Sequence, residues 1–461
     1  MTKQRKRRRV RRNSRQGTRQ RDYIPTTVPF SATPRGETPS IDEWAHPAVW
    51  TDRMLTTLLE GAVRGGKWHS LSDKVHGKLN LYWSAGKVLG RKGAPGVDGM
   101  TVDDFEARER TEVERLRTQL SEGSYRPDSV RRTWIPKPGS TERRPLGIPT
   151  VRDRIVQTAL VHVIEPIFDA TFHDRSFGFR RGRGCHDALR CVEELLESGY
   201  VYVVDADLKS YFDTIPKDRL MELVEEEISD SSVLKLIRSF LDQSILEELQ
   251  TWTPETGVPQ GAVLSPVLSN VYLNPLDHLM TEKGFEMVRY ADDFVILCRS
   301  QFEAEAALKE IRDWVGANGL TLHPTKTQVV DSRETSFSFL GYSFRGETRL
   351  PRAKSRRKLM ERINELTPRK SGHSLESTLQ RINSAFRGWF NYSRHCTWTV
   401  FDTYDARARK RLRRMLLKRH RVNRQRLSRT VRWPSAYFAA HGFRSLREAH
   451  NRLVQSHAGN Y

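Results

Sequence analysis

The sequence predicts an α+β fold, and three observations support this prediction. Short apolar runs next to turn residues, such as those at 201–208 and 289–300, are typical of buried strands. Segments with apolar residues at helical spacing separate these runs. From about residue 352 onward the pattern is helical only, and the segment is rich in basic residues. We therefore expect a part that mixes sheet and helix, followed by a helical part.

Composition bounds the class of protein. The chain has 461 residues, 37% of them hydrophobic and ten of them Trp, which is typical of a globular protein with two to four domains. No apolar run is long enough to span a membrane, and no apolar segment follows the basic first residues as in a secretory signal. The four cysteines form no CxxC pair, which argues against a zinc ribbon. We expect a cytoplasmic protein without a membrane partner.

The charge is strongly positive and unevenly distributed. The formal net charge is +22. Eleven Lys and Arg lie between Lys3 and Arg21 with no acid among them, and twelve more lie between Asp405 and Arg429. A basic surface that serves only solubility is the alternative, but two separate clusters around a more acidic middle favour a polyanionic partner. The sequence therefore predicts nucleic-acid binding.

The expected elements follow one another in a definite order. Residues 1–40 are rich in Arg and then in Thr, Ser and Pro, as expected for a flexible basic arm. The segments that follow are a helical region at 41–89, a Gly- and Pro-rich loop at 92–100, a charged helix at 107–120, a strand, basic turn and strand at 131–150, an apolar helix at 156–168, a strand at 201–208, a loop leading into a helix at 251–273, a hairpin around 289–300, a helix at 302–317 and a strand pair near 328–345. Beyond these, Leu359, Ile363 and Leu366, and then Leu379, Ile382 and Phe386, predict two amphipathic helices.

Four carboxylates end or begin the predicted strands. Asp292 and Asp293 form the turn of the hairpin, and Asp205 and Asp207 lie near the end of the strand at 201–208. Synthesis of DNA or RNA uses two divalent cations about 3.5–4 Å apart, and Mg²⁺ prefers carboxylate oxygens. A lone Asp is more often a turn or cap residue, but several acids at the ends of apolar strands predict a metal site. Spacing alone does not choose between Asp205 and Asp207.

The order of the motifs resembles one family. IPKPGSTERRPLGIP precedes VVDADLKSYFD, which precedes RYADDF, and KGAPGVDGMT, SFGFRRGRGCHDAL, GVPQGAVLSPVLSN, GLTLHPTKT and FSFLGYSF stand in the matching positions. Over roughly residues 85–450 the chain resembles the reverse transcriptases encoded in bacterial group II introns. The resemblance implies a right-hand polymerase, in which fingers and a palm with an antiparallel sheet packed on helices precede an α-helical thumb. The expected domains are the arm at 1–40, fingers and palm at 41–345, a thumb or maturase domain (domain X) at 346–425, and a basic segment at 426–461 without an endonuclease domain.

The resemblance also implies the catalytic centre. It assigns the catalytic acids as Asp207, Asp292 and Asp293, with Asp205 left as a neighbour. The same acids and the backbone carbonyl of Leu208 are the implied ligands of two Mg²⁺ ions, for which Mn²⁺ is a possible substitute. We expect Asp207 and Asp292 to bind metal directly, with Asp293 as a required companion.

Further residues are implied to bind the nucleotide and the nucleic acid. An aromatic ring at Phe212 would block a ribose 2′ hydroxyl, although the same residue could simply be part of the core. The expected nucleotide-binding residues are Lys137, Arg144, Arg154, Phe212, Gln260 and Lys326. The expected RNA-binding residues are Arg180, Arg183, Arg387, Trp389 and Tyr392, with core packing as the alternative for two of the three aromatic residues Trp389, Phe390 and Tyr392.

The function implied by the resemblance is twofold. The protein would copy intron RNA into DNA by target-primed reverse transcription, and it would bind the intron RNA to assist splicing. Its partners would be intron RNA, a DNA target and primer, and dNTPs, in the nucleoid or in ribonucleoprotein particles of a bacterium; a homodimer is left open. Two alternatives are a domesticated reverse transcriptase of phage defence or CRISPR adaptation, and a splicing factor with an inactive palm. The presence of Asp207, Asp292, Asp293 and Phe212 argues against an inactive palm.

Overall fold

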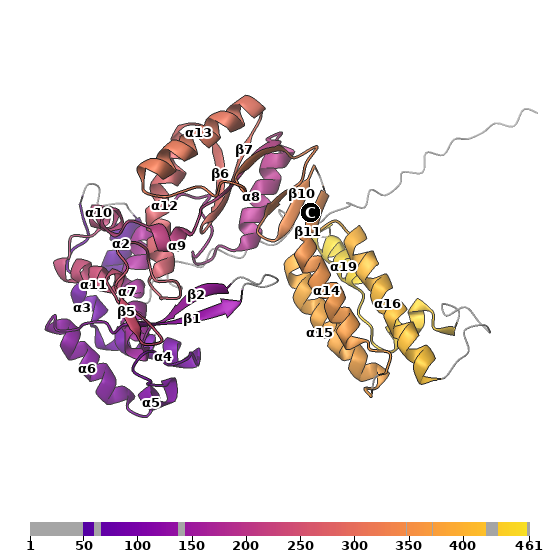
Figure 1. The fold of residues 1–461 in the computed structure, drawn as a ribbon, viewed down its shortest axis with the longest axis horizontal. Helices are drawn as coiled ribbons and strands as arrows, with labels where there is room; N and C mark the ends of the chain where they lie inside the picture. Colours follow the sequence, from indigo (N-terminus) through magenta and orange to yellow (C-terminus); the bar gives the residue numbers. More distant parts are fainter. Residues whose placement is uncertain are drawn as a thin grey trace, which may run out of the picture.

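We describe the protein from a computed structural model. The structure describes residues 49–59, 66–136, 143–346, 348–370, 372–420 and 432–458. The expected arm at 1–40 and Lys137 lie outside the described residues. Figure 1 shows the described part as an arch, in which an N-terminal helical region and a C-terminal helical region flank the palm sheet. No helix among the described residues is long and apolar enough to cross a membrane.

The N-terminal region combines helices with a small sheet. Its helices are α2 (Asp52–Leu59), α3 (Ser72–Val75), α4 (Lys78–Gly90), α5 (Val102–Glu106), α6 (Glu109–Ser121) and α7 (Val151–Asp169). The predicted helical region at 41–89 is thus three helices in its described part. Its sheet has the order β2-β1-β4-β5, formed by β1 (Val130–Pro136), β2 (Arg143–Ile148), β4 (Ile245–Glu247) and β5 (Gln250–Trp252). The side chain of the N-cap Thr150 accepts from the backbone N–H of Asp153, and α7 is buried along nearly its whole length, including the polar side chains of Asp153, Gln157 and His162.

The palm is a four-stranded antiparallel sheet with helices on both faces. Its order is β6-β7-β3-β8, with β3 (Tyr202–Asp207), β6 (Glu286–Tyr290), β7 (Asp293–Cys298) and β8 (Gln328–Asp331). The helices of this part are α8 (Cys185–Glu197), α9 (Tyr211–Thr214), α10 (Lys217–Glu227), α11 (Ser231–Leu241), α12 (Ser265–Glu282) and α13 (Gln301–Ala317). Alternation along the strands sends Val204 and Phe294 into the core with α12 and α13, and Val203 and Val295 into the core with α8.

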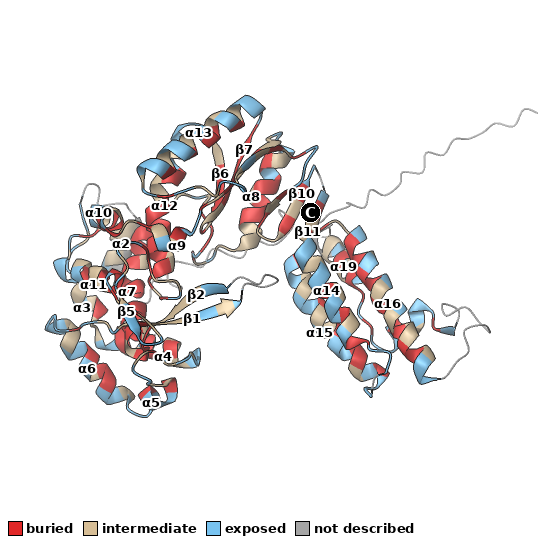
Figure 2. Ribbon diagram, viewed as in Figure 1, coloured by how far each residue is buried: buried red, intermediate tan, exposed pale blue. Residues whose placement is uncertain are grey.

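The C-terminal region is helical, as predicted. A three-stranded sheet of β9 (Phe337–Phe339), β10 (Tyr342–Arg345) and β11 (Thr348–Pro351) leads into α14 (Ala353–Leu366), α15 (Leu375–Ser393), α16 (Thr399–Arg419), α18 (Ser435–Ala440) and α19 (Leu446–Ala458). All six apolar residues that predicted the amphipathic helices of α14 and α15 are buried. Figure 2 shows that these helices turn their buried residues toward one another and leave an exposed outer surface.

The prediction of an α+β fold is confirmed, and the range near 328–345 contains the predicted strand pair together with a further strand. The segment near 328–345 was expected to form one strand pair. β9 and β10 form this pair, while β8 joins the palm sheet beside β3. The partner of β8 lies far away in the sequence, so the local pattern does not show which sheet β8 joins.

Candidate active site

The palm sheet brings the predicted acids together at one end. Asp207 at the end of β3 lies directly opposite Asp293 at the start of β7. Residues directly opposite each other in an antiparallel pair share a face, so these two acids lie on the same face. Tyr290 pairs with Asp293, which leaves Ala291 and Asp292 as a two-residue turn. Ala291 has a φ of 59°, a left-handed conformation that such tight hairpin turns require.

A buried ion pair holds this turn from behind. The guanidinium of Arg289 donates to both oxygens of Asp277, to Oδ1 of Asn270 at 2.9 Å and to the carbonyl of Ala291 at 2.9 Å. The side chains of Arg289 and Asp277 are 0% and 2% exposed. Gly178 packs so closely on the turn that a Cβ there would overlap the backbone nitrogen of Ala291. The conformation of the turn is therefore fixed by the protein itself.

Burial and neighbouring acids raise the pKa of Asp292 and Asp293. Burial raises the pKa of Asp292, and the nearby charge of Asp207 raises it further. Burial also raises the pKa of Asp293 to about 6; the charge of Arg352 opposes this shift, while Asp205 and Asp292 add to it. The charge of Asp207 thus acts on Asp292, and the charges of Asp205 and Asp292 act on Asp293. Such a group of carboxylates is costly unless a cation compensates it.

Lys326 lies on the exposed side of the acids. Its Nζ donates to Oδ2 of Asp207 at 2.5 Å. The loop that carries it is fixed to β3, because His323 N donates to the carbonyl of Asp207 at 2.7 Å and Lys209 N donates to that of Thr321 at 2.8 Å. These two bonds flank the β-bridge between Leu208 and Leu322. In such a pair the backbone N–H and C=O of Leu208 point away from Leu322. The carbonyl of Leu208 therefore points toward the other side of β3, where β7 lies.

The donor set suits a hard cation. Among the described residues, no group of three or more His, Cys, Asp or Glu has the geometry to hold a metal ion. Asp207, Asp292, Asp293 and the carbonyl of Leu208 nevertheless offer only oxygen, which is what Mg²⁺ prefers. The carboxylates repel one another, and the ammonium of Lys326 shows that a cation can approach Asp207. The chemistry of these residues therefore fits the metal ions that the family resemblance implies.

Phe212 and Gln260 line one cavity. It has a volume of about 420 Å³ and lies between β1, β2, α9 and the loop 257–260. Phe212 also packs against the core, so core packing and contact with a ligand are compatible. Gln260 Nε2 donates to both oxygens of Asp213 at 3.3 Å. Gly257 has a φ of 94°, and a Cβ there would lie 2.9 Å from two carbonyl oxygens of α9, which explains the glycine.

The basic fingers residues do not all reach this cavity. Arg132 and Trp134 on β1, and Gly147 opposite Arg132 on β2, line it. Arg144 is exposed and lies opposite Ile135, so it belongs to the other face of the hairpin. The guanidinium of Arg154 donates to the carbonyls of Ala94 and Thr150, so it supports the loop 92–100. The structure thus brings Phe212 and Gln260 together and leaves Arg144 apart from them.

Two of the predicted RNA contacts form contacts within the protein. Arg180 is buried, and its guanidinium donates to Asp169 and to the carbonyls of His173 and Ser176. Trp389 is half-buried against Phe401 and Tyr404, and its Nε1 donates to Oγ of Ser355. The burial of Arg180 argues against a contact with RNA, whereas Trp389 is half-buried and its contact with RNA stays a prediction.

The other three predicted RNA contacts are more accessible. Arg387 is exposed on α15. Tyr392 is exposed as well, although its hydroxyl donates to the carbonyl of Leu340. Arg183 ion-pairs with Asp174 at 3.2 Å and lies over the ring of Phe177. The alternative of core packing therefore holds for Trp389 and Phe390, which both pack against the C-terminal core.

Sequence reasoning missed three residues of the site. Asp213 holds the amide of Gln260, Arg289 holds the turn between β6 and β7, and Arg352 places a positive charge near Asp205 and Asp293. For Arg289 a signal existed, because a charged residue stands within an apolar strand just before the acids. Arg352 gave no signal, since it comes from the start of α14, far away in the sequence.

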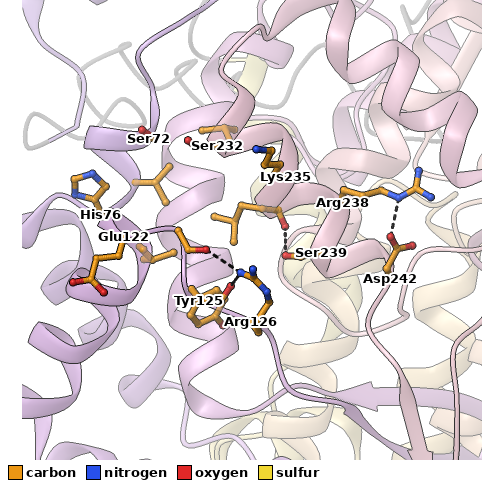
Figure 3. A pocket seen from close by; sticks show the side chains of 15 residues that line it. Ser72, His76, Glu122, Tyr125, Arg126, Ser232, Lys235, Arg238, Ser239 and Asp242 are labelled. Atoms are coloured by element: carbon orange, nitrogen blue, oxygen red, sulfur yellow. Dashed lines mark hydrogen bonds and ion pairs between the residues drawn. The ribbon is translucent and has the colours of Figure 1, made fainter.

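A larger cavity lies away from the acids. It has a volume of about 620 Å³ and is formed by α3, the end of α6 and α11. Figure 3 shows that positively and negatively charged side chains line its wall. Arg126 donates to the backbone carbonyl of Gly123, and Arg238 donates to Asp242. Since none of the predicted catalytic or nucleotide-binding residues lines it, this cavity is not part of the candidate active site.

Comparison with known proteins gives the family. Residues 135–344 match the model of the reverse transcriptase (RNA-dependent DNA polymerase), and residues 356–433 match that of the group II intron, maturase-specific domain. Protein YkfC of Escherichia coli is 34% identical over 336 residues, which are 64% of this chain and 86% of that protein. The group II intron-encoded protein LtrA of Lactococcus lactis is 34% identical over 203 residues, 44% of this chain and 34% of that protein.

Two solved structures are more distantly similar. The partial Cas6-RT-Cas1–Cas2 complex is 24% identical, with 53% of this chain and 42% of that chain covered and a TM-score of 0.35. Telomerase from Candida albicans is 12% identical, with 69% and 64% covered and a TM-score of 0.41. The two family matches and the similarity to YkfC establish that the chain belongs to the group II intron reverse transcriptase/maturase family.

Proposed function

We propose that the protein is an RNA-directed DNA polymerase that works with two Mg²⁺ ions at Asp207, Asp292 and Asp293. The observation that carries the proposal is the meeting of these acids, from β3 and from the turn between β6 and β7, in a place where burial and mutual repulsion raise the pKa of Asp292 and Asp293. The carbonyl of Leu208, turned toward the same side, would complete the oxygen donors.

The residues around the acids have distinct tasks in this proposal. Bound metal ions would supply activation of the primer 3′ hydroxyl and charge compensation for the triphosphate. Asp207 and Asp292 bind, and Asp293 adds negative charge behind them. Lys326 holds a proton at Nζ, close to Asp207, where a pyrophosphate leaving group could take it.

The cavity beside the acids would select the nucleotide. Phe212 fills the space that a ribose 2′ hydroxyl would need. Gln260 gives its amide hydrogens to Asp213, and a carboxylate can only accept, so the amide oxygen is turned away from Asp213. That oxygen can accept from a sugar hydroxyl or a base. Arg144 and Arg154 remain proposed contacts of the triphosphate side, together with Lys137.

The C-terminal helical region would bind RNA. The match of residues 356–433 to the maturase-specific domain and the net charge of +22 support this part of the proposal. Arg387 and Tyr392 are its exposed candidates, with Arg183 on the palm side. In the full proposal the protein copies the intron RNA into DNA and uses the nicked DNA target as primer. It also stabilises the folded intron RNA during splicing.

Primer extension on poly(rA)/oligo(dT) with Mg²⁺ tests the catalytic claim. We expect dNTP incorporation by the wild type and none by Asp292→Ala. Equal incorporation by the two proteins, or none by either, would reject the claim.

Splicing of the intron that flanks the gene, with and without the protein, tests the maturase claim. Active polymerisation without any effect on splicing would favour a domesticated reverse transcriptase instead. An Arg387→Ala variant should weaken the effect on splicing and leave primer extension on the short duplex unchanged.

A further inference from the structure

One large aromatic side chain beside the catalytic turn is exposed. Phe179 is 45% exposed and has a φ of 59°. This left-handed conformation is unfavourable for a residue with a bulky side chain. Strained residues of this kind persist where the surrounding structure over-determines them, and they cluster at functional sites.

The loop around Phe179 is held by the same network as the catalytic turn. Asn270 Nδ2 donates to the carbonyl of Gly178 at 2.8 Å, while Oδ1 of Asn270 accepts from Arg289, the residue that also binds the carbonyl of Ala291. Phe177 N donates to the carbonyl of Arg289 at 2.9 Å. Gly178 packs directly on Ala291. Phe179 therefore follows a residue that touches the catalytic turn, and its backbone is fixed relative to that turn.

The other aromatic residues of this segment behave differently. Phe172 and Phe177 are 8% and 9% exposed, and the guanidiniums of Arg180 and Arg183 lie over their rings. Of these three rings only that of Phe179 is exposed, and Phe179 is the residue with the left-handed backbone conformation. Its sequence neighbours are basic, and Arg181 ion-pairs with Glu165 at 3.0 Å. Arg180 and Arg183 are also ion-paired, with Asp169 and Asp174, so the exposed ring rather than free charge is what this rigid loop offers to a ligand. An exposed apolar ring suits the apolar face of a base or sugar.

We propose that Phe179 is a contact site for the template–primer duplex, where its ring packs against a base or sugar next to the primer end. The inference rests on the proposed function, because a polymerase holds the primer end at the acids of this turn. The ligand class is an RNA–DNA duplex with a 3′ primer terminus. The role is that of a binding residue; Phe179 takes no part in proton transfer or metal binding.

The test separates binding from folding by means of Phe179→Gly. Glycine accepts a positive φ without strain, so this variant should melt at the same temperature as the wild type or higher. Loss of the ring should raise the Kd for a fluorescent RNA–DNA template–primer roughly tenfold, the scale of one lost base–aromatic contact. Phe179→Trp should keep the Kd within about twofold of the wild type. Phe302→Ala removes an 82% exposed Phe from α13 and is the matched control, expected to change neither quantity.

Each outcome decides between explanations. A Kd of Phe179→Gly within twofold of the wild type overturns the inference, as does a melting temperature that falls below that of the wild type, because the ring would then be structural. A wild type that binds the duplex but extends no primer rejects the proposed function, while the Kd ratio still decides the role of Phe179. A wild type that extends the primer, with unchanged binding by Phe179→Gly, rejects only the inference.

Discussion

Two carboxylate sites in the palm differ in how their charge is compensated. Asp277 is buried and receives hydrogen bonds from Arg289 on both of its oxygens. Asp292 and Asp293, three and four residues beyond Arg289, are half-buried, and burial together with neighbouring acids raises their pKa. The first site is complete within the chain and stabilises the scaffold. At the second site, the charges of Arg289 and Arg352 do not offset burial and the neighbouring acids, and this difference marks it as the place where a cation from outside would bind.

Breaking the buried ion pair of Asp277 and Arg289 should have the largest effect on stability. Asp277→Ala leaves the guanidinium of Arg289 buried without its counter-charge, so we expect a loss of about 3–5 kcal/mol in the free energy of unfolding. Urea denaturation measures it. Asp313→Ala is the control, because its pair with Lys309 is exposed to solvent and should contribute little to stability. Similar losses in the two variants would contradict the contrast between a buried and an exposed pair.

Removing the charge of Asp292 should affect catalysis instead. Asp292→Asn removes a carboxylate that would bind metal, and we expect the single-turnover rate of primer extension to fall at least roughly 100-fold. The melting temperature should not fall, since the substitution removes a charge that is unfavourably placed. A variant that keeps more than a tenth of the wild-type rate would show that Asp292 is not a metal ligand.

The pH dependence of stability should reveal Asp293. Its pKa is raised to about 6 in the folded protein, so the folded state holds this proton more tightly than the unfolded state. The resulting stabilisation is present in full below about pH 4, and it is lost as the pH rises through about 6, by up to about 3 kcal/mol. Urea denaturation without divalent cations, between pH 4.5 and 7.5, should show this loss in the wild type and a smaller one in Asp293→Asn.

The buried acid Asp153 is present in both the wild type and Asp293→Asn, so it does not disturb the comparison of their pH profiles. Burial also raises the pKa of Asp153 to about 6, and its contribution cancels in the difference between wild type and Asp293→Asn. Added Mg²⁺ should raise the melting temperature of the wild type at pH 7.5 more than that of the variant. Equal pH profiles for the two proteins would contradict the prediction for Asp293.

The smallest effect on stability is expected for Lys326, which lies on the exposed side of the acids Asp207, Asp292 and Asp293. Lys326 and Asp207 are both well exposed, so Lys326→Ala should change the free energy of unfolding by less than about 1 kcal/mol. Chemical denaturation at low and high salt checks this, because the contribution of an exposed pair should shrink with salt. A loss as large as that of Asp277→Ala would mean that Lys326 supports the fold.

The sequence by itself determined the local features of this protein. The apolar periodicities of β3, α7, α14 and α15 predicted their conformation, because alternation and helical spacing depend on neighbours within a few residues. The acids at the strand ends and the basic composition predicted the kind of site. The tertiary structure alone decided which groups face one another: Asp207 opposite Asp293, and Gln260 beside Asp213.

The correction for Arg180 has the same origin. Arg180 looked like an RNA contact because a basic residue in a sequence carries no sign of its solvent exposure. Asp169 and three carbonyls surround Arg180, which is buried, and Arg144 lies on the face of its hairpin that points away from the cavity. Burial, strand partners and desolvated charge arise from contacts between segments far apart in the chain, and only the folded structure brings those segments together.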